Sequence, residues 1–157
     1  MRKAILAAAM LAVLGACGQQ PGAGGKAGAA AGAAAPPANA EAAITAWARG
    51  LHGTSLIEPV AIFYGDFSGD GAVDALAWAD YETGGSSANH TVALFRNEGG
   101  AMTFLRTDET VYGSEPREVG FTPGFIRLTT TMPKEGDPHC CPTGSQEWMI
   151  ETGQPRE

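Results

Sequence analysis

Two apolar runs decide the fold of this chain: VAIFY at residues 60–64 and VDALAWADY at residues 73–81. Both are short and rich in β-branched and aromatic residues, which is typical of β-strands. The second run is almost continuously apolar, so it predicts a strand that is buried on both faces. The connection between them is rich in aspartate and glycine, which favours a turn.

Similar runs continue through the rest of the chain. The glycines in the segment NEGG at residues 97–100 predict a hairpin turn between the runs at residues 91–95 and 102–106. Strands spaced this closely favour antiparallel meander pairing over helical crossovers. The further predicted strands are residues 91–95, 102–106, 117–121, 124–132 and 146–151.

Ahead of the first strand, residues 41–51 carry a helical pattern. Apolar side chains recur there at i, i+3, i+4 and i+7, namely at Ile44, Trp47, Ala48 and Leu51. We therefore predict an α+β fold that is mainly β, an antiparallel meander sheet with one N-terminal helix. Residues 41–157 are predicted to form this single globular domain.

The N-terminal end has the pattern of an export signal at residues 1–16. A basic start is followed by an apolar run of 11 residues, 4–14, and by small residues. This run is too short to span a bilayer, which takes about 20 apolar residues. Residues 18–40 consist mostly of alanine, glycine and proline without large apolar side chains. That composition predicts a flexible tether.

The tetrapeptide Leu14-Gly15-Ala16-Cys17 resembles the lipobox of bacterial lipoproteins, although Gly15 stands where that family prefers Ala, Ser or Thr. The resemblance implies cleavage before Cys17 and acylation of its sulfur and its new amino group. Several acyl chains anchor a protein stably where one would not. No aspartate follows Cys17, which by the family's sorting rule implies the outer membrane, facing the periplasm. An ordinary signal peptide cut near Ala16 is the alternative.

Charge limits the partners of the mature chain. The whole sequence has a formal net charge of −7, and removal of Arg2 and Lys3 with the signal leaves 8 basic and 17 acidic residues, a charge of −9. Such a charge argues against nucleic acid. The predicted partners are the membrane, through the lipid anchor, and an envelope protein or a cell-wall glycan.

The sharpest chemical motif is the loop DFSGDGAVD at residues 66–74. It resembles the calcium loop of integrin-type FG-GAP repeats, in a single copy. The resemblance implies a structural calcium ion, because calcium prefers hard oxygen ligands. The alternative is an acidic hairpin of Asx turns that binds no ion tightly. The predicted ligands are the side chains of Asp66, Ser68, Asp70 and Asp74 and a backbone carbonyl near Ala72.

Cys140 and Cys141 are the other cysteines, in the turn-forming segment GDPHCCPTG at residues 136–144. In an oxidising compartment they can pair only with each other once Cys17 is lipidated. A disulfide between neighbours is strained, because their Cα atoms lie about 3.8 Å apart. A vicinal disulfide, two reduced thiols, and a soft-metal site for copper(I) with His139 all remain open.

The combination of an Asp-Gly loop with a later Cys-Cys-Pro motif resembles a group of bacterial lipoproteins and secreted domains that have no assigned activity. The sequence also contains neither a Gly-x-Ser-x-Gly elbow nor the paired histidines of zinc proteases, and we predict no catalytic residue. The predicted function is a lipid-anchored envelope protein, a non-enzymatic binding or structural module stabilised by calcium. The alternative is a redox or copper-handling lipoprotein that uses the His-Cys-Cys turn.

Overall fold

The computed structural model describes residues 34–84, 88–138 and 140–153. The predictions about the signal segment, Cys17, most of the tether and His139 lie outside these described residues.

One helix, α1 (Ala40–His52), opens the described domain and is followed by the short 3₁₀ turn η1 (Gly53–Ser55). Its apolar stripe is buried at Ala40, Ile44 and Ala48, as the sequence pattern predicts. The helix ends where Gly53 adopts a φ of 57°, a conformation that costs glycine little.

In the described part of the chain, seven strands follow the helix, and all pairings between them are antiparallel. They form two meanders, a four-stranded sheet in the order β1-β2-β3-β4 and a three-stranded sheet in the order β5-β6-β7. The predicted fold class, mainly β with antiparallel meander pairing and one N-terminal helix, is confirmed, but the strands form two sheets where we predicted a single meander sheet. The strands are β1 (Ala61–Gly65), β2 (Asp74–Glu82), β3 (Ala88–Glu98), β4 (Ala101–Asp108), β5 (Ser114–Thr122), β6 (Phe125–Met132) and β7 (Gly144–Glu151).

The division into two sheets occurs after β4, in the connection 109–113. Val111 in this connection is buried in the core. Gly113 has a φ of 105°, and a Cβ atom there would lie 2.6 Å from the carbonyl oxygen of Thr131. The chain can therefore turn tightly against β6 and start the second sheet only with glycine at this position.

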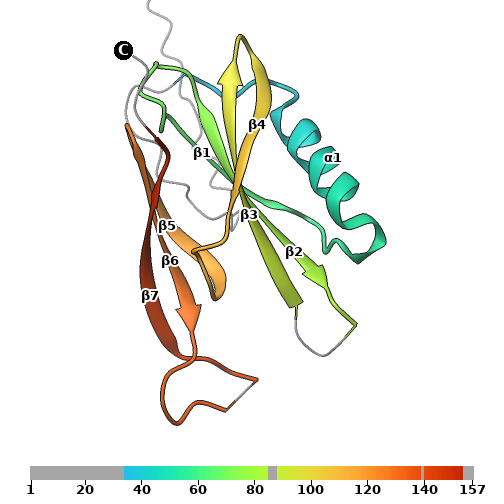
Figure 1. Cartoon of the computed structure of the whole chain (residues 1–157), viewed down its shortest axis with the longest axis vertical. Coiled ribbons are helices and arrows are strands. Elements are labelled where there is room, and N and C mark those ends of the chain that lie inside the picture. The colour runs from blue at the N-terminus through green and yellow to red at the C-terminus, as the bar shows by residue number, and fades with distance from the viewer. Residues whose placement is uncertain (1–33, 85–87, 139, 154–157) are drawn as a thin grey trace, which may run out of the picture.

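The four-stranded sheet is the middle one of three layers, with α1 on one face and β5–β7 on the other (Figure 1). Along β2, Leu76 and Trp78 face the second sheet, and the intervening alanines face α1. Small side chains on that face let the helix pack closely. This central position explains why residues 73–79 are buried on both faces, as predicted, whereas Asp80 and Tyr81 at the end of the predicted run are half-buried.

Among the described residues, no helix has both the length and the apolar character needed to cross a membrane.

Candidate functional site

The acidic loop, residues 66–74, connects β1 to β2 and is organised by its own carboxylates. Asp66 accepts hydrogen bonds from the backbone N–H groups of Gly69 at 2.6 Å and Gly71 at 2.8 Å. Asp70 accepts one from the N–H of Ala72 at 2.9 Å. These are Asx-type turns, in which a short carboxylate side chain takes the place of a backbone acceptor.

Asp74 has a different environment, because its side chain is fully buried. One carboxylate oxygen accepts the N–H of Ser68 at 2.9 Å, and the other accepts the N–H of Asn97 at 3.0 Å. Asp74 therefore fastens the acidic loop to the hairpin between β3 and β4. A buried carboxylate is tolerated where such hydrogen bonds replace its lost water.

The oxygen donors of the acidic loop match the ligand preference of calcium. In the described residues, however, no group of three or more His, Cys, Asp or Glu side chains converges closely enough to hold a metal ion. The carboxylates of Asp66, Asp70 and Asp74 accept loop and hairpin N–H groups instead. Calcium binding by this loop stays a prediction.

We call residues 133–138 and 140–143, between β6 and β7, the cysteine arm, and Asp137 closes it. Its carboxylate accepts the N–H of Thr143 at 2.7 Å, the N–H of Lys134 at 3.0 Å and the Thr143 hydroxyl at 2.9 Å. The hydrogen bond from the Thr143 amide, followed by that from Lys134, lowers the pKa of Asp137 below its usual value. The arm is thus clamped at its base.

Cys140 and Cys141 are free thiols in this structure, and both are exposed. The N–H of Cys141 donates to the carbonyl of Pro138 at 3.0 Å. A hydrogen bond between the two thiols raises the pKa of Cys141. A vicinal disulfide and a copper(I) site stay predictions.

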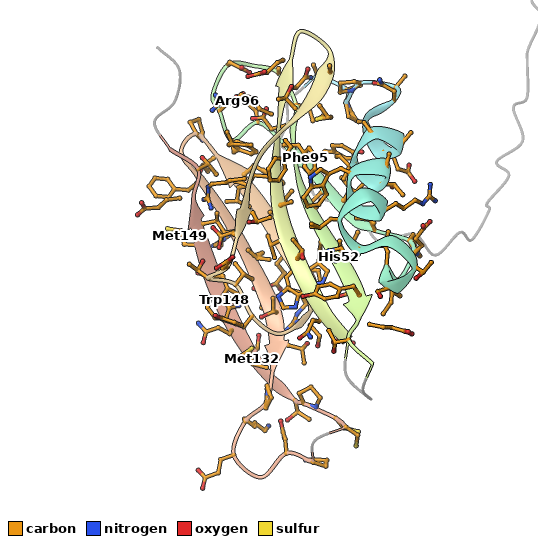
Figure 2. All side chains as sticks on the ribbon, turned by 45° about the vertical axis from the view of Figure 1, so that its right-hand side comes forward. His52, Phe95, Arg96, Met132, Trp148 and Met149 are labelled. Carbon is orange, nitrogen blue, oxygen red and sulfur yellow. The ribbon has the colours of Figure 1, made fainter. Side chains whose placement is uncertain are left out.

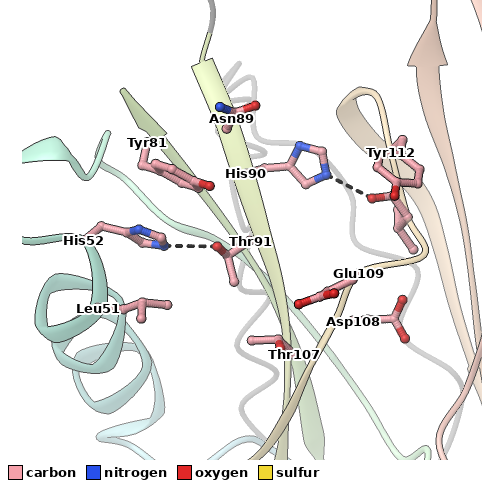
Figure 3. Close-up of a pocket in the computed structure, with 11 residues that line it drawn as sticks. Leu51, His52, Tyr81, Asn89, His90, Thr91, Thr107, Asp108, Glu109 and Tyr112 are labelled. Carbon is pink, nitrogen blue, oxygen red and sulfur yellow. Dashed lines mark hydrogen bonds between the residues drawn. The ribbon is translucent and has the colours of Figure 1, made fainter. Parts of the chain in front are cut away.

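An open cleft of about 490 Å³ lies where β4 leaves the first sheet (Figure 3). It takes its walls from the end of α1, from β2, β3 and β4, and from the β4–β5 connection. We call it the edge cleft, and it is lined by Leu51, His52, Tyr81, residues 89–91, residues 107–109, Val111 and Tyr112.

The wall on the α1 side is built around His52. Its ring stacks on that of Tyr81, with centroids 4.1 Å apart and planes within 12° of parallel. Its Nε2 atom lies 3.1 Å from the hydroxyl of Thr91. Burial lowers the pKa of His52 below its usual value, so the neutral imidazole is favoured at pH 7.

The opposite wall is built around His90, which stacks on Trp78 with ring centroids 4.0 Å apart. Its Nε2 atom lies 3.1 Å from the carbonyl oxygen of Val111. A carbonyl only accepts, so Nε2 carries the proton and donates. The indole N–H of Trp78 donates to Asp80 at 2.8 Å. This hydrogen bond fixes the indole ring on which His90 stacks.

Tyr112 stands at the mouth of the edge cleft, and 59% of its surface is exposed. Its backbone carbonyl accepts the hydroxyl of Thr130 at 2.7 Å, and that hydroxyl accepts the indole N–H of Trp148 at 2.8 Å. The second sheet thus positions Tyr112 while leaving its ring open to a ligand.

The charges of the edge cleft are acidic. Asp108 forms an ion pair with Arg106 at 2.8 Å. Burial, the largest single influence, raises the pKa of Asp108, but hydrogen bonds from Thr110 and Arg106 together outweigh it and lower the pKa. Glu109 forms no ion pair within the described part of the chain. No lysine or arginine is among the lining residues that the structure describes.

The pair formed by Thr91 and His52 has the distance of a nucleophile and its base. Such a pair also needs a third group that orients the imidazole. Within the described part of the chain, His52 forms a hydrogen bond through Nε2, and its Nδ1 atom has no such orienting group. The edge cleft combines aromatic rings with fixed polar groups, as ligand-binding pockets commonly do.

The sequence-based predictions missed the edge cleft, because its residues come from five separate segments. The acidic loop and the cysteine arm were found as continuous motifs. The one signal that could have helped is strand pairing, since the register places His90 opposite Asp80 and Thr91 opposite Ala79.

No protein-family model matches this chain, and neither the curated proteins nor the solved structures contain a match to it.

Proposed function

We propose that this protein is a lipid-anchored binding module of the cell envelope, without enzymatic activity, and that the edge cleft is its binding surface. The observation that carries the proposal is a cleft of about 490 Å³ whose rings and polar groups are already held in place. Binding sites of this size usually combine apolar walls with a few oriented polar groups.

Preorganisation supports binding, because side chains that are already fixed lose little entropy when a ligand arrives. His52 is fixed by Tyr81 and Thr91, and His90 is fixed by Trp78 and the Val111 carbonyl. The two histidines therefore present constant shapes on opposite walls of the edge cleft.

The anchor and the tether determine where the module works. Lipidated Cys17 holds the chain on the outer membrane facing the periplasm, and residues 18–40 connect it to the domain. A flexible tether of this length has a mean reach of roughly 25–30 Å. The domain can thus search the space beside the membrane, where an envelope protein or a cell-wall glycan lies, and calcium in the acidic loop stabilises it.

Replacing Cys17 by alanine removes the acceptor of the lipid. Palmitate labelling of the protein is lost, and the chain moves from the membrane fraction to the periplasmic fraction, because acyl chains supply the anchoring energy. Metabolic labelling and fractionation of cells measure both effects. Cys141→Ala is the matched control and keeps label and location. Palmitate that persists on Cys17→Ala overturns the anchor.

A photo-crosslinking residue in place of Tyr112 tests the binding surface in cells. p-Benzoylphenylalanine at this position is expected to trap an envelope component, because Tyr112 stands at the mouth of the edge cleft. Met149, 64% exposed on the outer face of the second sheet (Figure 2), is the control position of similar exposure. Adducts at Met149 with none at Tyr112 contradict the proposal.

A further inference from the structure

We propose that the edge cleft accepts an extended peptide segment, which pairs with the free edge of β3 as an added strand. This inference rests on the proposed function and names its ligand class.

The first observation is a strand position that β4 leaves empty. Strand β3 begins at Ala88, but its pairing with β4 starts only at Val92, opposite Asp108. Within the described part of the chain, residues 88–91 pair with β2 alone. An edge strand presents unpaired N–H and C=O groups along its free side. Residues 89–91 line the edge cleft, so this free edge forms part of its wall.

The second observation is that the chain is held away from this position. The hydroxyl and the N–H of Thr110 both donate to Asp108, which turns the chain directly after β4. Arg106 donates to the carbonyl of Glu151 in β7 at 2.6 Å and so ties β4 to the second sheet. The connection after β4 therefore does not cover the free edge of β3.

The free edge of β3 at residues 88–91 has the length of a short added strand. Four residues of β-strand are about 13 Å long at roughly 3.3 Å per residue. Alternate side chains of an added strand point to opposite faces of the sheet. One set would contact His52 and Tyr81 on the α1 face, and the other would contact His90 and Tyr112 on the face toward the second sheet.

The free edge also lacks the usual protection against an added strand. Natural edge strands are often blocked by lysine or proline, and residues 88–91 are Ala, Asn, His and Thr. Main-chain pairing of this kind is an established mode of peptide recognition. A cell-wall glycan has no strand of alternating donors and acceptors to match this edge, so the geometry favours a peptide.

The charged groups of the edge cleft indicate which peptides it favours. Asp108 is neutralised by Arg106, which leaves Glu109 as the charge at the edge cleft, with no lysine or arginine among the described lining residues. The favoured segment is basic, because Glu109 attracts a positive charge and would repel an acidic segment.

The test begins with a library of random nonapeptides displayed on phage and selected against the full chain carrying Cys17→Ala. Selected peptides are synthesised with N-methyl groups on every second amide, in the two alternating registers. One register should lose affinity about tenfold or more, since each lost hydrogen bond costs about that factor. The other register should bind within about twofold, because a strand pairs with β3 through one edge only.

A charge reversal tests whether Glu109 attracts basic peptides to the edge cleft. Glu109→Arg is expected to weaken the selected peptides about threefold to tenfold, the range for one charge at a site rim. Glu135→Arg, an exposed position in the cysteine arm, makes the same charge change outside the edge cleft and should leave affinity unchanged. Thermal melting confirms that both variants are folded.

Three results would overturn the inference: equal tolerance of N-methylation in both registers, equal effects of Glu109→Arg and Glu135→Arg, or selection of no peptide. If muramidase-released cell-wall glycan binds while no peptide does, and Tyr112 crosslinks in cells, the ligand class is wrong and the proposed function stands. If Tyr112 yields no adduct either, the proposed function fails as well.

Discussion

Replacing Asp74 by alanine lowers the free energy of unfolding by roughly 2–6 kcal/mol. The fully buried carboxylate accepts the N–H groups of Ser68 and Asn97, and an unsatisfied buried donor costs about 1–3 kcal/mol. Alanine leaves both donors without an acceptor. Urea denaturation in the presence of a calcium chelator measures the effect free of any bound ion.

Asp70→Ala is the matched control in the same acidic loop. Asp70 is exposed and accepts only the Ala72 N–H in the described structure, so its loss in chelator should stay below about 1 kcal/mol. If calcium binds the loop, the wild-type chain melts at a higher temperature in calcium, and Asp70→Ala loses that increase. Equal losses for the two variants in chelator would contradict the structural role given to Asp74.

Replacing Trp78 by alanine removes a large side chain from between the two sheets. Trp78 is fully buried, stacks on His90 and donates to Asp80. A buried tryptophan replaced by alanine costs about 3–5 kcal/mol, because the neighbouring atoms do not close the cavity. This cost is a large share of the roughly 5–15 kcal/mol that stabilises a typical domain. Calorimetry or urea denaturation measures it.

Two control variants separate the packing of Trp78 from its hydrogen bond and from the loss of any aromatic ring. They are Trp78→Phe and Tyr112→Ala. Phenylalanine retains a ring beneath His90 but gives up the hydrogen bond to Asp80, so its loss should be clearly smaller. Tyr112 is exposed, and Tyr112→Ala should change stability by no more than about 0.5 kcal/mol. A Trp78→Ala chain as stable as Tyr112→Ala would show that the sheets do not pack through Trp78.

The strands and the helix could be predicted from the sequence because their signals are local. The strand at residues 73–81 is indicated by a nearly continuous apolar run. The helix at residues 41–51 is indicated by apolar side chains at helical spacing. The division into two sheets could not be predicted, because it depends on which strand pairs with which. The turn that enforces it, with Gly113 pressed against Thr131, carries no distinctive motif.

The candidate sites also differ in whether their sequence signals are local. The acidic loop was found from its spacing, but the same aspartates are typical of both a calcium site and a set of Asx turns. The hydrogen bonds of Asp66 and Asp70 follow the turn pattern, and calcium stays a prediction. The edge cleft depends on His52, Tyr81 and His90 meeting in space, which no local pattern indicates.

The proposed function requires that an envelope ligand occupies the edge cleft. The most direct measurement is an amide-resolved NMR titration of the ¹⁵N-labelled chain carrying Cys17→Ala with a tryptic digest of envelope proteins and, separately, with muramidase-released cell-wall glycan. We expect chemical-shift changes concentrated at residues 89–91, residues 107–109 and Tyr112. Saturable shifts confined to the outer face around Phe125 and Met149, or no shifts with either probe, would contradict the proposed function.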